Sequence, residues 1–236
     1  MIRAGLVAIF VSCSGCAGSY TASRPADYYA QGAPAAGTEV SLFGSDSAVL
    51  SDTEIARILD FRYSPPPLSR VALLPIGWGS WTGWSEEMAT SAAAVDSRLL
   101  ETLRASPRIY DASILPSILV PDQRTVPYLR EAAARYQADL LLVFRSACRS
   151  FERYRLFQSD RARAYCGVEA VLLDVRTGLV PFVATSTQSY DVEETETDLN
   201  FRETVLRSQL EAIGAGLVEV SQAIARFIES DGDAGA

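Results

Sequence analysis

The densest group of side chains able to bind an anion lies between residues 145 and 163. Six of the 21 basic residues fall in this segment, although the chain has a formal net charge of −8. Four share a parity along a predicted strand and so point to one face, and two follow on the return strand: Arg145, Arg149, Arg153 and Arg155, then Arg161 and Arg163. This face fits anionic headgroups, peptidoglycan carboxylates or an acidic partner. The alternative is a solvated strand face paired with the chain's own acids.

All three tryptophans of the chain lie in one short segment, at Trp78, Trp81 and Trp84, with glycines between them. The segment follows a predicted central strand, and open α/β sheets place ligand sites at the ends of such strands. Indole rings bury a large area at low entropic cost, so this loop is suited to bind a peptide, glycan or lipid. The alternative is that the rings close one end of the hydrophobic core.

Two of the four cysteines, Cys148 and Cys166, lie on either side of the arginine-rich turn. A hairpin that turns around Phe157 places them directly opposite each other. In an oxidising compartment this arrangement predicts a cross-strand disulfide. The other two cysteines, Cys13 and Cys16, are close to the N-terminus.

Two residue types that many enzymes need are absent, because the chain has no histidine and all 21 basic residues are arginine. Without histidine there is no Ser-His-Asp or Cys-His pair, no His-ligated metal and no imidazole acid–base catalysis. Without lysine there is no Schiff base and no P-loop lysine. We therefore expect a protein that is not an enzyme and that needs no metal or cofactor. The acidic balance also argues against nucleic-acid binding.

A run of acids at 191–198 is the remaining group that could be taken for a cation site; its members include Glu193, Glu194, Glu196 and Asp198. A calcium loop needs carboxylates at defined alternating spacing and a turn glycine, and both are lacking. We expect a solvated connection whose charge favours the N-terminus of the next helix.

The elements that position these residues begin with a βαβα pattern and continue with a run of strands. Apolar runs, helix periodicity and turn residues predict, in chain order, a strand at 70–76, a helix at 86–105, one or two short strands within 108–121, a helix at 125–137, and strands at 140–157, 162–175 and 179–190. With the final helix the order is β-α-β-α-β-β-β-α. The fold class is α/β (α+β), with helices packed on a mixed sheet.

The last predicted element is a helix of about 30 residues that opens with a capping-box pattern at Asn200 and Glu203. Its apolar residues alternate in spacing between four and three: Leu206, Leu210, Ile213, Leu217, Val220, Ile224 and Phe227. This stripe either packs along the domain's own sheet or forms an interface with a second copy or a partner. Gly214 and Gly216 interrupt it and indicate close approach of another backbone.

The N-terminus resembles a bacterial lipoprotein signal. Arg3 precedes an apolar run at 4–11, and small residues stand directly before Cys16. The run is too short to span a bilayer, which takes about 20 apolar residues. Removal of residues 1–15 leaves Cys16 for lipidation; cleavage before Cys13, or an ordinary secretory cleavage nearby, are the alternatives. Because residue 17 is not aspartate, analogy with enterobacterial sorting favours the periplasmic face of the outer membrane.

We therefore expect four parts in the chain. Residues 1–15 are the signal peptide, and residues 16–67 are a flexible tether with one short helix. Residues 68–229 are the α/β domain, and residues 230–236 are a disordered tail.

Several short segments together resemble a group of bacterial envelope lipoproteins: RVALLPI, ILPSIL, LREAAARYQADLLLVFRS and VEAVLLDVRTGLV, preceded by the lipobox and tether. Their order is similar to that of the rhombotarget-type lipoproteins. It is more distantly similar to the domain of the curli-secretion lipoprotein and of the outer-membrane activators of penicillin-binding proteins. The resemblance implies binding of protein partners rather than catalysis. The tryptophan loop, the arginine-rich hairpin and the two later cysteines depart from the pattern.

These observations predict a non-catalytic, outer-membrane-anchored periplasmic lipoprotein that binds a protein partner in envelope assembly or export. One alternative is a structural homo-oligomer, such as a secretion-pore or ring subunit. Another is a lipoprotein that binds peptidoglycan or another glycan through the tryptophan loop.

Overall fold

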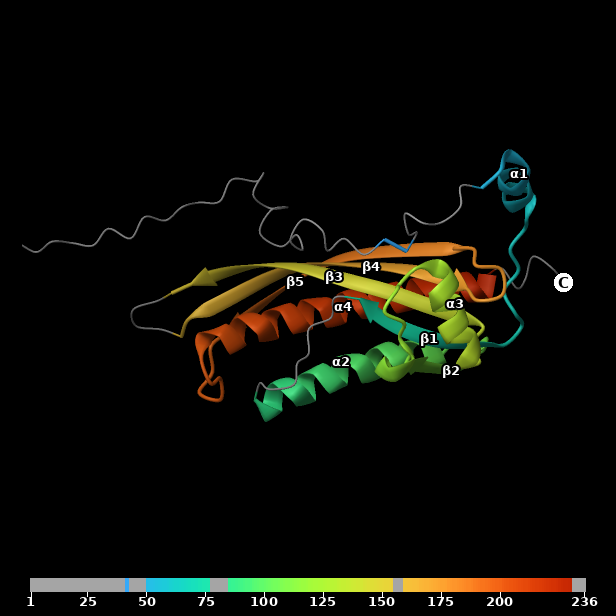
Figure 1. The fold of residues 1–236 in the computed structure, drawn as a ribbon. Coiled ribbons are helices and arrows are strands. Elements are labelled where there is room, and N and C mark those ends of the chain that lie inside the picture. Colours follow the sequence, from blue (N-terminus) through green and yellow to red (C-terminus); the bar gives the residue numbers. More distant parts are fainter. Residues whose placement is uncertain (1–40, 43–49, 77–84, 155–158, 231–236) are drawn as a thin grey trace, which may run out of the picture. The chain divides into compact units, whose positions relative to one another are not determined.

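The computed structural model describes residues 41–42, 50–76, 85–154 and 159–230. The chain divides into two units, residues 1–31 and 32–236, and every described residue belongs to the second. The elements in chain order (Figure 1) are α1 (Asp52–Asp60), β1 (Ser69–Ile76), α2 (Glu86–Arg104), β2 (Ile109–Ile114), the short 3-10 helix η2 (Ser117–Leu119), α3 (Val126–Arg135), β3 (Leu140–Arg153), β4 (Arg161–Asp174), β5 (Phe182–Glu193) and α4 (Phe201–Ser230).

The strands form one five-stranded mixed sheet in the order β2-β1-β3-β4-β5. β1 runs parallel to both β2 and β3, because each connection between these strands passes through a helix. β3, β4 and β5 are antiparallel and joined directly. The predicted fold class and element order are therefore confirmed. The last strand begins three residues later than predicted, directly after Pro181, whose ring removes the amide that a ladder needs.

The parallel part of the sheet is buried on both faces. α2 and α4 cover one face, where Val71 and Leu73 of β1 meet Leu140 and Leu142 of β3 in the larger core. α3 covers the other face over a smaller core, which holds the alternate residues of the same two strands. This double burial explains why β1 and the start of β3 are continuous apolar runs.

The antiparallel part of the sheet is covered on one face only. Along β4 the even-numbered residues are buried and the odd-numbered residues up to Val171 are exposed or half-buried. The buried set packs under α4, which runs along β3, β4 and β5 (Figure 1). This alternation is typical of an antiparallel sheet with one solvated face.

α4 uses its apolar stripe inside its own domain. Leu210, Leu217 and Ile224 are at most 1% exposed and belong to the larger core. Of the two interpretations of the stripe, the structure therefore supports packing on the domain's own sheet. A Cβ on Gly214 would meet Val95 of α2, and one on Gly216 would meet Val168 of β4. The expectation of a neighbouring backbone was wrong, since both glycines make room for valine side chains.

α1 begins with a cap formed by residues of its own first turn. The side chain of Ser51 accepts from the amide of Glu54, and the Glu54 carboxylate accepts from the amide of Ser51, which completes a capping box at the start of the predicted short helix. Within the described residues, no side chain of α1 is buried.

We expect Gly216→Ala to destabilise the domain. The new Cβ would lie 2.9 Å from Cγ2 of Val168, a stiff β-branched side chain beneath α4. Such overpacking costs about 1–3 kcal/mol, which outweighs the gain of about 1 kcal/mol in helix propensity. The measurement is the free energy of unfolding in urea.

Gly167→Ala is the matched control, because a Cβ at Gly167 meets nothing within 4 Å. The double variant Gly216→Ala with Val168→Ala should lose less free energy of unfolding than the two single variants lose in sum. Equal stability of Gly216→Ala and wild type would contradict the assigned contact.

Candidate binding surface

The solvated side of β3, β4 and β5 brings together the basic residues that the sequence singled out. The register pairs residues of equal parity, so all odd-numbered positions lie on this side. We call the following set the arginine face: Arg145, Arg149, Phe151, Arg153, Arg161, Arg163, Tyr165, Glu169, Asp191 and Glu193. Arg155, the tryptophans Trp78, Trp81 and Trp84, and the lipidation residue Cys16 lie outside the described residues.

Three arginines of this face are paired with acids on the neighbouring strand. Arg145 lies 2.6 Å from Glu169 across β3 and β4. Across β4 and β5, Arg163 lies 2.6 Å from Asp191, and Arg161 pairs with Glu193. The alternative of a face paired with the chain's own acids therefore holds for these three residues. Exposed pairs of this kind contribute little to stability, so they orient the guanidinium groups more than they stabilise the fold.

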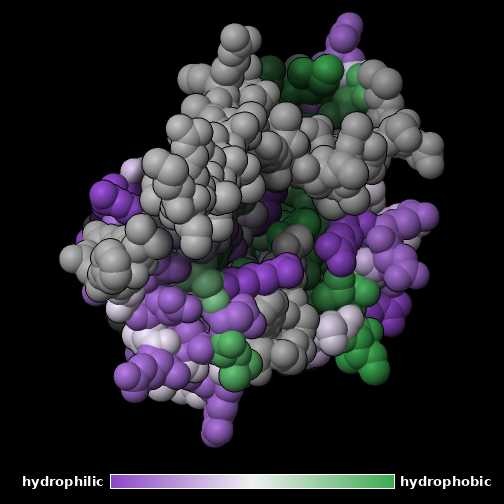
Figure 2. Space-filling view, turned by 90° about the vertical axis from the view of Figure 1, so that its left-hand side faces the viewer, coloured by the Kyte–Doolittle hydropathy of each residue, from purple (hydrophilic) through white to green (hydrophobic). Residues whose placement is uncertain are grey.

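The arginine face still has an excess of basic charge. It holds five arginines and three acids, whereas the whole chain carries −8. Hydrogen bonds to Asp191 and Tyr165 hold the pKa of Arg163 above its ordinary value, so its charge is constant at any working pH. Seen from the hairpin end of the sheet, the coloured surface is largely hydrophilic with scattered hydrophobic residues (Figure 2).

Two exposed aromatic side chains lie among these arginines. Phe151 and Tyr165 meet edge to face with ring centroids 5.7 Å apart, and they are 47% and 37% exposed. The guanidinium of Arg149 lies over the Phe151 ring at 5.1 Å. These two rings were not predicted as site residues from the sequence, although their odd numbers give them the same parity as the arginines. Aromatic and arginine side chains are the types most enriched at energetic centres of interfaces.

A disulfide fixes the hairpin below this face. Cys148 and Cys166 are directly paired in the register, with Cα atoms 4.1 Å apart, and are joined as the sequence predicted. Both are even-numbered and therefore face α4, where Cys166 is fully buried. The disulfide holds β3 against β4 without occupying the arginine face.

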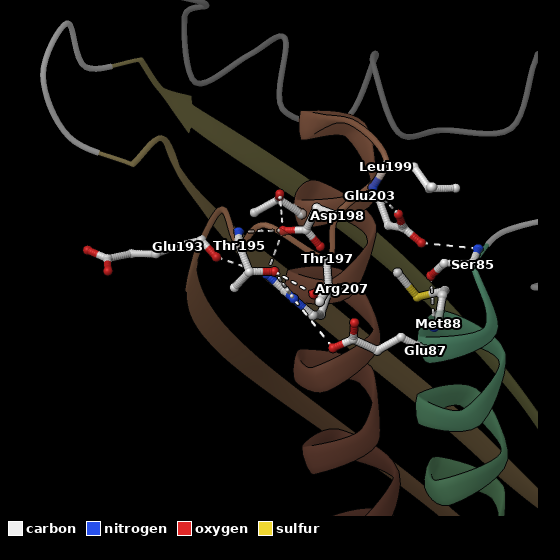
Figure 3. Close-up of polar contacts among 11 residues, drawn as sticks. Ser85, Glu87, Met88, Glu193, Thr195, Thr197, Asp198, Leu199, Glu203 and Arg207 are labelled. Atoms are coloured by element: carbon white, nitrogen blue, oxygen red, sulfur yellow. Dashed lines mark hydrogen bonds and ion pairs between the residues drawn. The ribbon is translucent and has the colours of Figure 1, made fainter.

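A polar cluster closes the end of the sheet where β5 leads into α4 (Figure 3). The side chain of Asp198 is only 3% exposed, and its carboxylate accepts from the Thr195 amide at 2.8 Å and from Thr204 Oγ1 at 2.8 Å. Arg207 of α4 donates to the same carboxylate at 2.9 Å and to the Glu193 carbonyl at 2.8 Å. The expectation of a wholly solvated connection was wrong at Asp198, because the half-buried Arg207 of α4 shields its carboxylate.

Glu203 joins the first turn of α4 to the start of α2. It is 2% exposed, and its carboxylate accepts from the amides of Leu199 at 2.8 Å and of Ser85 at 3.1 Å (Figure 3). The prediction that Asn200 and Glu203 form a capping box was wrong, because the Glu203 carboxylate accepts from the amides of Leu199 and Ser85 instead. Hydrogen bonding from Ser85 is the main reason that the pKa of Glu203 is lowered, and burial opposes it.

The described ranges contain no group of three or more Cys, Asp or Glu side chains placed to hold a metal ion. They also contain no helix with the length and apolar character needed to cross a membrane.

The chain is structurally similar to bacterial lipoproteins, at low sequence identity. No protein-family model matches it, and no curated protein matches it. A variant of the PelC dodecamer from Paraburkholderia phytofirmans is 19% identical over 70% of this chain and 94% of its own, with a TM-score of 0.37. A minor lipoprotein from Acinetobacter baumannii is 11% identical over 69% of this chain and 91% of its own, with a TM-score of 0.32. Lipoprotein GNA1162 from Neisseria meningitidis is 10% identical over 63% of this chain and 99% of its own, with a TM-score of 0.30. TM-scores below 0.5 are too low to argue from, so function must follow from this chain's own residues.

We expect reduction of the Cys148–Cys166 disulfide to lower the free energy of unfolding by about 2–4 kcal/mol. The bond closes a loop of 18 residues in sequence separation and constrains the unfolded chain. The measurement is urea unfolding with and without reductant. The double variant Cys148→Ala with Cys166→Ala should be as unstable as the reduced protein and insensitive to reductant. Identical stability of oxidised and reduced wild type would contradict this account.

We expect Glu203→Gln to lower stability by about 1–3 kcal/mol at neutral pH, because one buried amide loses its carboxylate acceptor. The folded pKa of Glu203 lies below the unfolded value of 4.5. Its contribution is therefore complete above pH 4.5 and is lost as the pH falls through the folded pKa.

The measurement is the free energy of unfolding of both proteins between pH 7 and pH 3. The difference between them should shrink as the solution becomes acidic. Glu131→Gln is the control, since that side chain is 60% exposed on α3. A difference that grows towards low pH would contradict the assigned role.

Proposed function

We propose that this chain is a lipid-anchored protein of the bacterial envelope that binds an acidic segment of a protein partner, without catalysis. The observation that carries the proposal is the arginine face: an open sheet surface with excess basic charge and two exposed rings, in an acidic chain. Anchoring through Cys16 and location at the periplasmic side of the outer membrane are part of the proposal, and they come from the N-terminal sequence.

The paired arginines keep donors for a partner. A guanidinium has five N–H groups, and Arg163 uses Nε and Nη2 toward Asp191. Its remaining donors can bind a carboxylate of another chain while the existing pair holds the group in place. An arginine oriented in this way loses less side-chain entropy on binding than a free one does.

The two rings supply the apolar part of the surface. Phe151 and Tyr165 contact each other, so their geometry is set before a partner arrives. Burying exposed aromatic area contributes affinity, while the surrounding charges select an acidic segment and disfavour a basic one. Because every contributing side chain stands on a strand, the surface needs little reordering on binding.

An oligoglutamate peptide with a fluorescent label is a defined probe for this proposal. We expect Arg149→Glu with Arg153→Glu to weaken its binding by about tenfold or more, since two favourable charges become repulsive. The measurement is fluorescence anisotropy at two salt concentrations, and binding should weaken as salt rises.

The control is Arg135→Glu with Arg226→Glu, an equal change of charge on α3 and α4 at residues outside the arginine face. It should change the affinity by less than about twofold at moderate salt. No peptide binding by wild type, or equal loss in both variants, would refute the proposal. Binding of anionic lipid vesicles or oligogalacturonate, but not of the peptide, would assign the face to a lipid or a glycan instead.

A further inference from the structure

β5 forms an unusually open edge of the sheet. It is 12 residues long, lies last in the strand order, and pairs with β4 over its whole length without a shift in register (Figure 1). Among the described residues, no strand pairs with its outer side. Long regular edges invite pairing with another chain, so proteins usually shorten, bulge, charge or cover them.

The opposite edge of the same sheet shows these protections. β2 has only six residues, and its pairing with β1 is interrupted by a shift next to Ser69. Asp111 of β2 is held by Arg70 and Arg104, and Arg104 also donates to the carbonyl of Ala112. β5 is twice as long and pairs without a shift, and the acids that arginines hold on it, Asp191 and Glu193, lie only at its C-terminal end, where Arg207 also donates to the Glu193 carbonyl. β5 contains no lysine, arginine, proline or glycine, and β-branched Val183, Thr185 and Thr187 favour a strand.

The register shows which amides of β5 are available. Cys148 and Cys166 lie 4.1 Å apart at Cα, the close spacing of a non-hydrogen-bonded pair, so the backbone groups of Cys166 point to β5. Its partner Gln188 therefore bonds back to β4, and the even-numbered residues of β5 do the same. Consistent with this, the amide of Glu194 donates to the carbonyl of Asp160. The odd-numbered amides, including those of Thr185 and Thr187, point outward.

We infer that β5 pairs with β5 of a second copy of this chain, antiparallel about a twofold axis, so that two sheets join into one. Charge selects this orientation. The only charged residues of β5 are Asp191 and Glu193, both at its C-terminal end. Antiparallel pairing lays this end beside the uncharged N-terminal end of the other copy, whereas parallel pairing would oppose like charges.

In the register that we propose, Ser186 of one copy lies opposite Ser186 of the other. This register suits both the side chains and the outward amides of β5. It makes Thr185 and Thr187 of the two copies a hydrogen-bonded pair, which uses outward amides only. On the α4 side it places Phe182 opposite Tyr190 of the second copy, and Tyr190 is 45% exposed in the single chain. Threonine pairs and aromatic pairs across strands both stabilise a sheet.

The pairing has a consequence for the arginine face. Residues of equal parity keep the same side across a continuous sheet, so the two arginine faces lie side by side. One partner with two acidic segments, or two partners, can then bind together with a gain in avidity. The dimer does not depend on this binding, so each proposal can fail alone.

Thr187→Pro tests the inference in the full chain in detergent. Proline removes an outward amide that β4 does not use, so the fold should persist while the pairing is lost. By sedimentation, wild type and the control Thr187→Val should be dimers at about 10 µM, and Thr187→Pro should bind itself at least about tenfold more weakly. A monomeric wild type, or an unchanged dimer of Thr187→Pro, would overturn the inference.

Hydrogen exchange gives a second test that needs no variant. In wild type the amides of Thr185, Thr187 and Ser189 should exchange at least about tenfold more slowly when the protein is concentrated into the dimeric range. The outward amides of β2 serve as an internal control and should not change. Exchange in β5 that is independent of concentration would overturn the inference even if Thr187→Pro fails to fold.

Discussion

Coverage of one face of β4 by α4 is the constraint on which the rest of this structure depends. Ala162, Ala164, Cys166, Val168 and Ala170 are all buried beneath the helix. A slip of one residue in the register would bring charged odd-numbered residues under α4, so the core enforces the pairing of β4 with both neighbours. The disulfide, the three cross-strand ion pairs and the common side of the arginines all follow from that register.

α4 packs closely on β4, and this close packing explains which residues the helix contains. The buried side of β4 is made mainly of small residues, and α4 contributes Gly216 and the fully buried Ser208 and Ser221. Both serine hydroxyls donate to carbonyls of their own helix, so neither needs a partner in the sheet. At its first turn, Glu203 ties the helix to α2, and this contact fixes where α4 begins along the sheet.

The sequence was informative wherever local periodicity decides the outcome. Apolar runs, caps and turns predicted the order of elements, and strand parity placed Cys148 opposite Cys166 and put Arg145, Arg149 and Arg153 on one side. It was misleading where a tertiary contact decides. The side chain of Asp198 is shielded where Arg207, nine positions later in α4, meets it, and Glu203 accepts from Ser85, more than 100 positions away. Such tertiary pairs leave no periodic signal in the chain.

Under the proposed function, the two halves of the sheet divide stability from recognition. β1 and the first residues of β3 are buried on both sides and present almost no surface to a partner. Strands β4 and β5 keep one face and one edge open, yet α4, the disulfide and the inter-strand pairs hold them in place. Binding to a surface held in this way costs little conformational entropy, so modest contacts are enough for a specific complex. An open half-sheet held in this way is therefore suited to the recognition role proposed for it, which an incompletely covered core would not need.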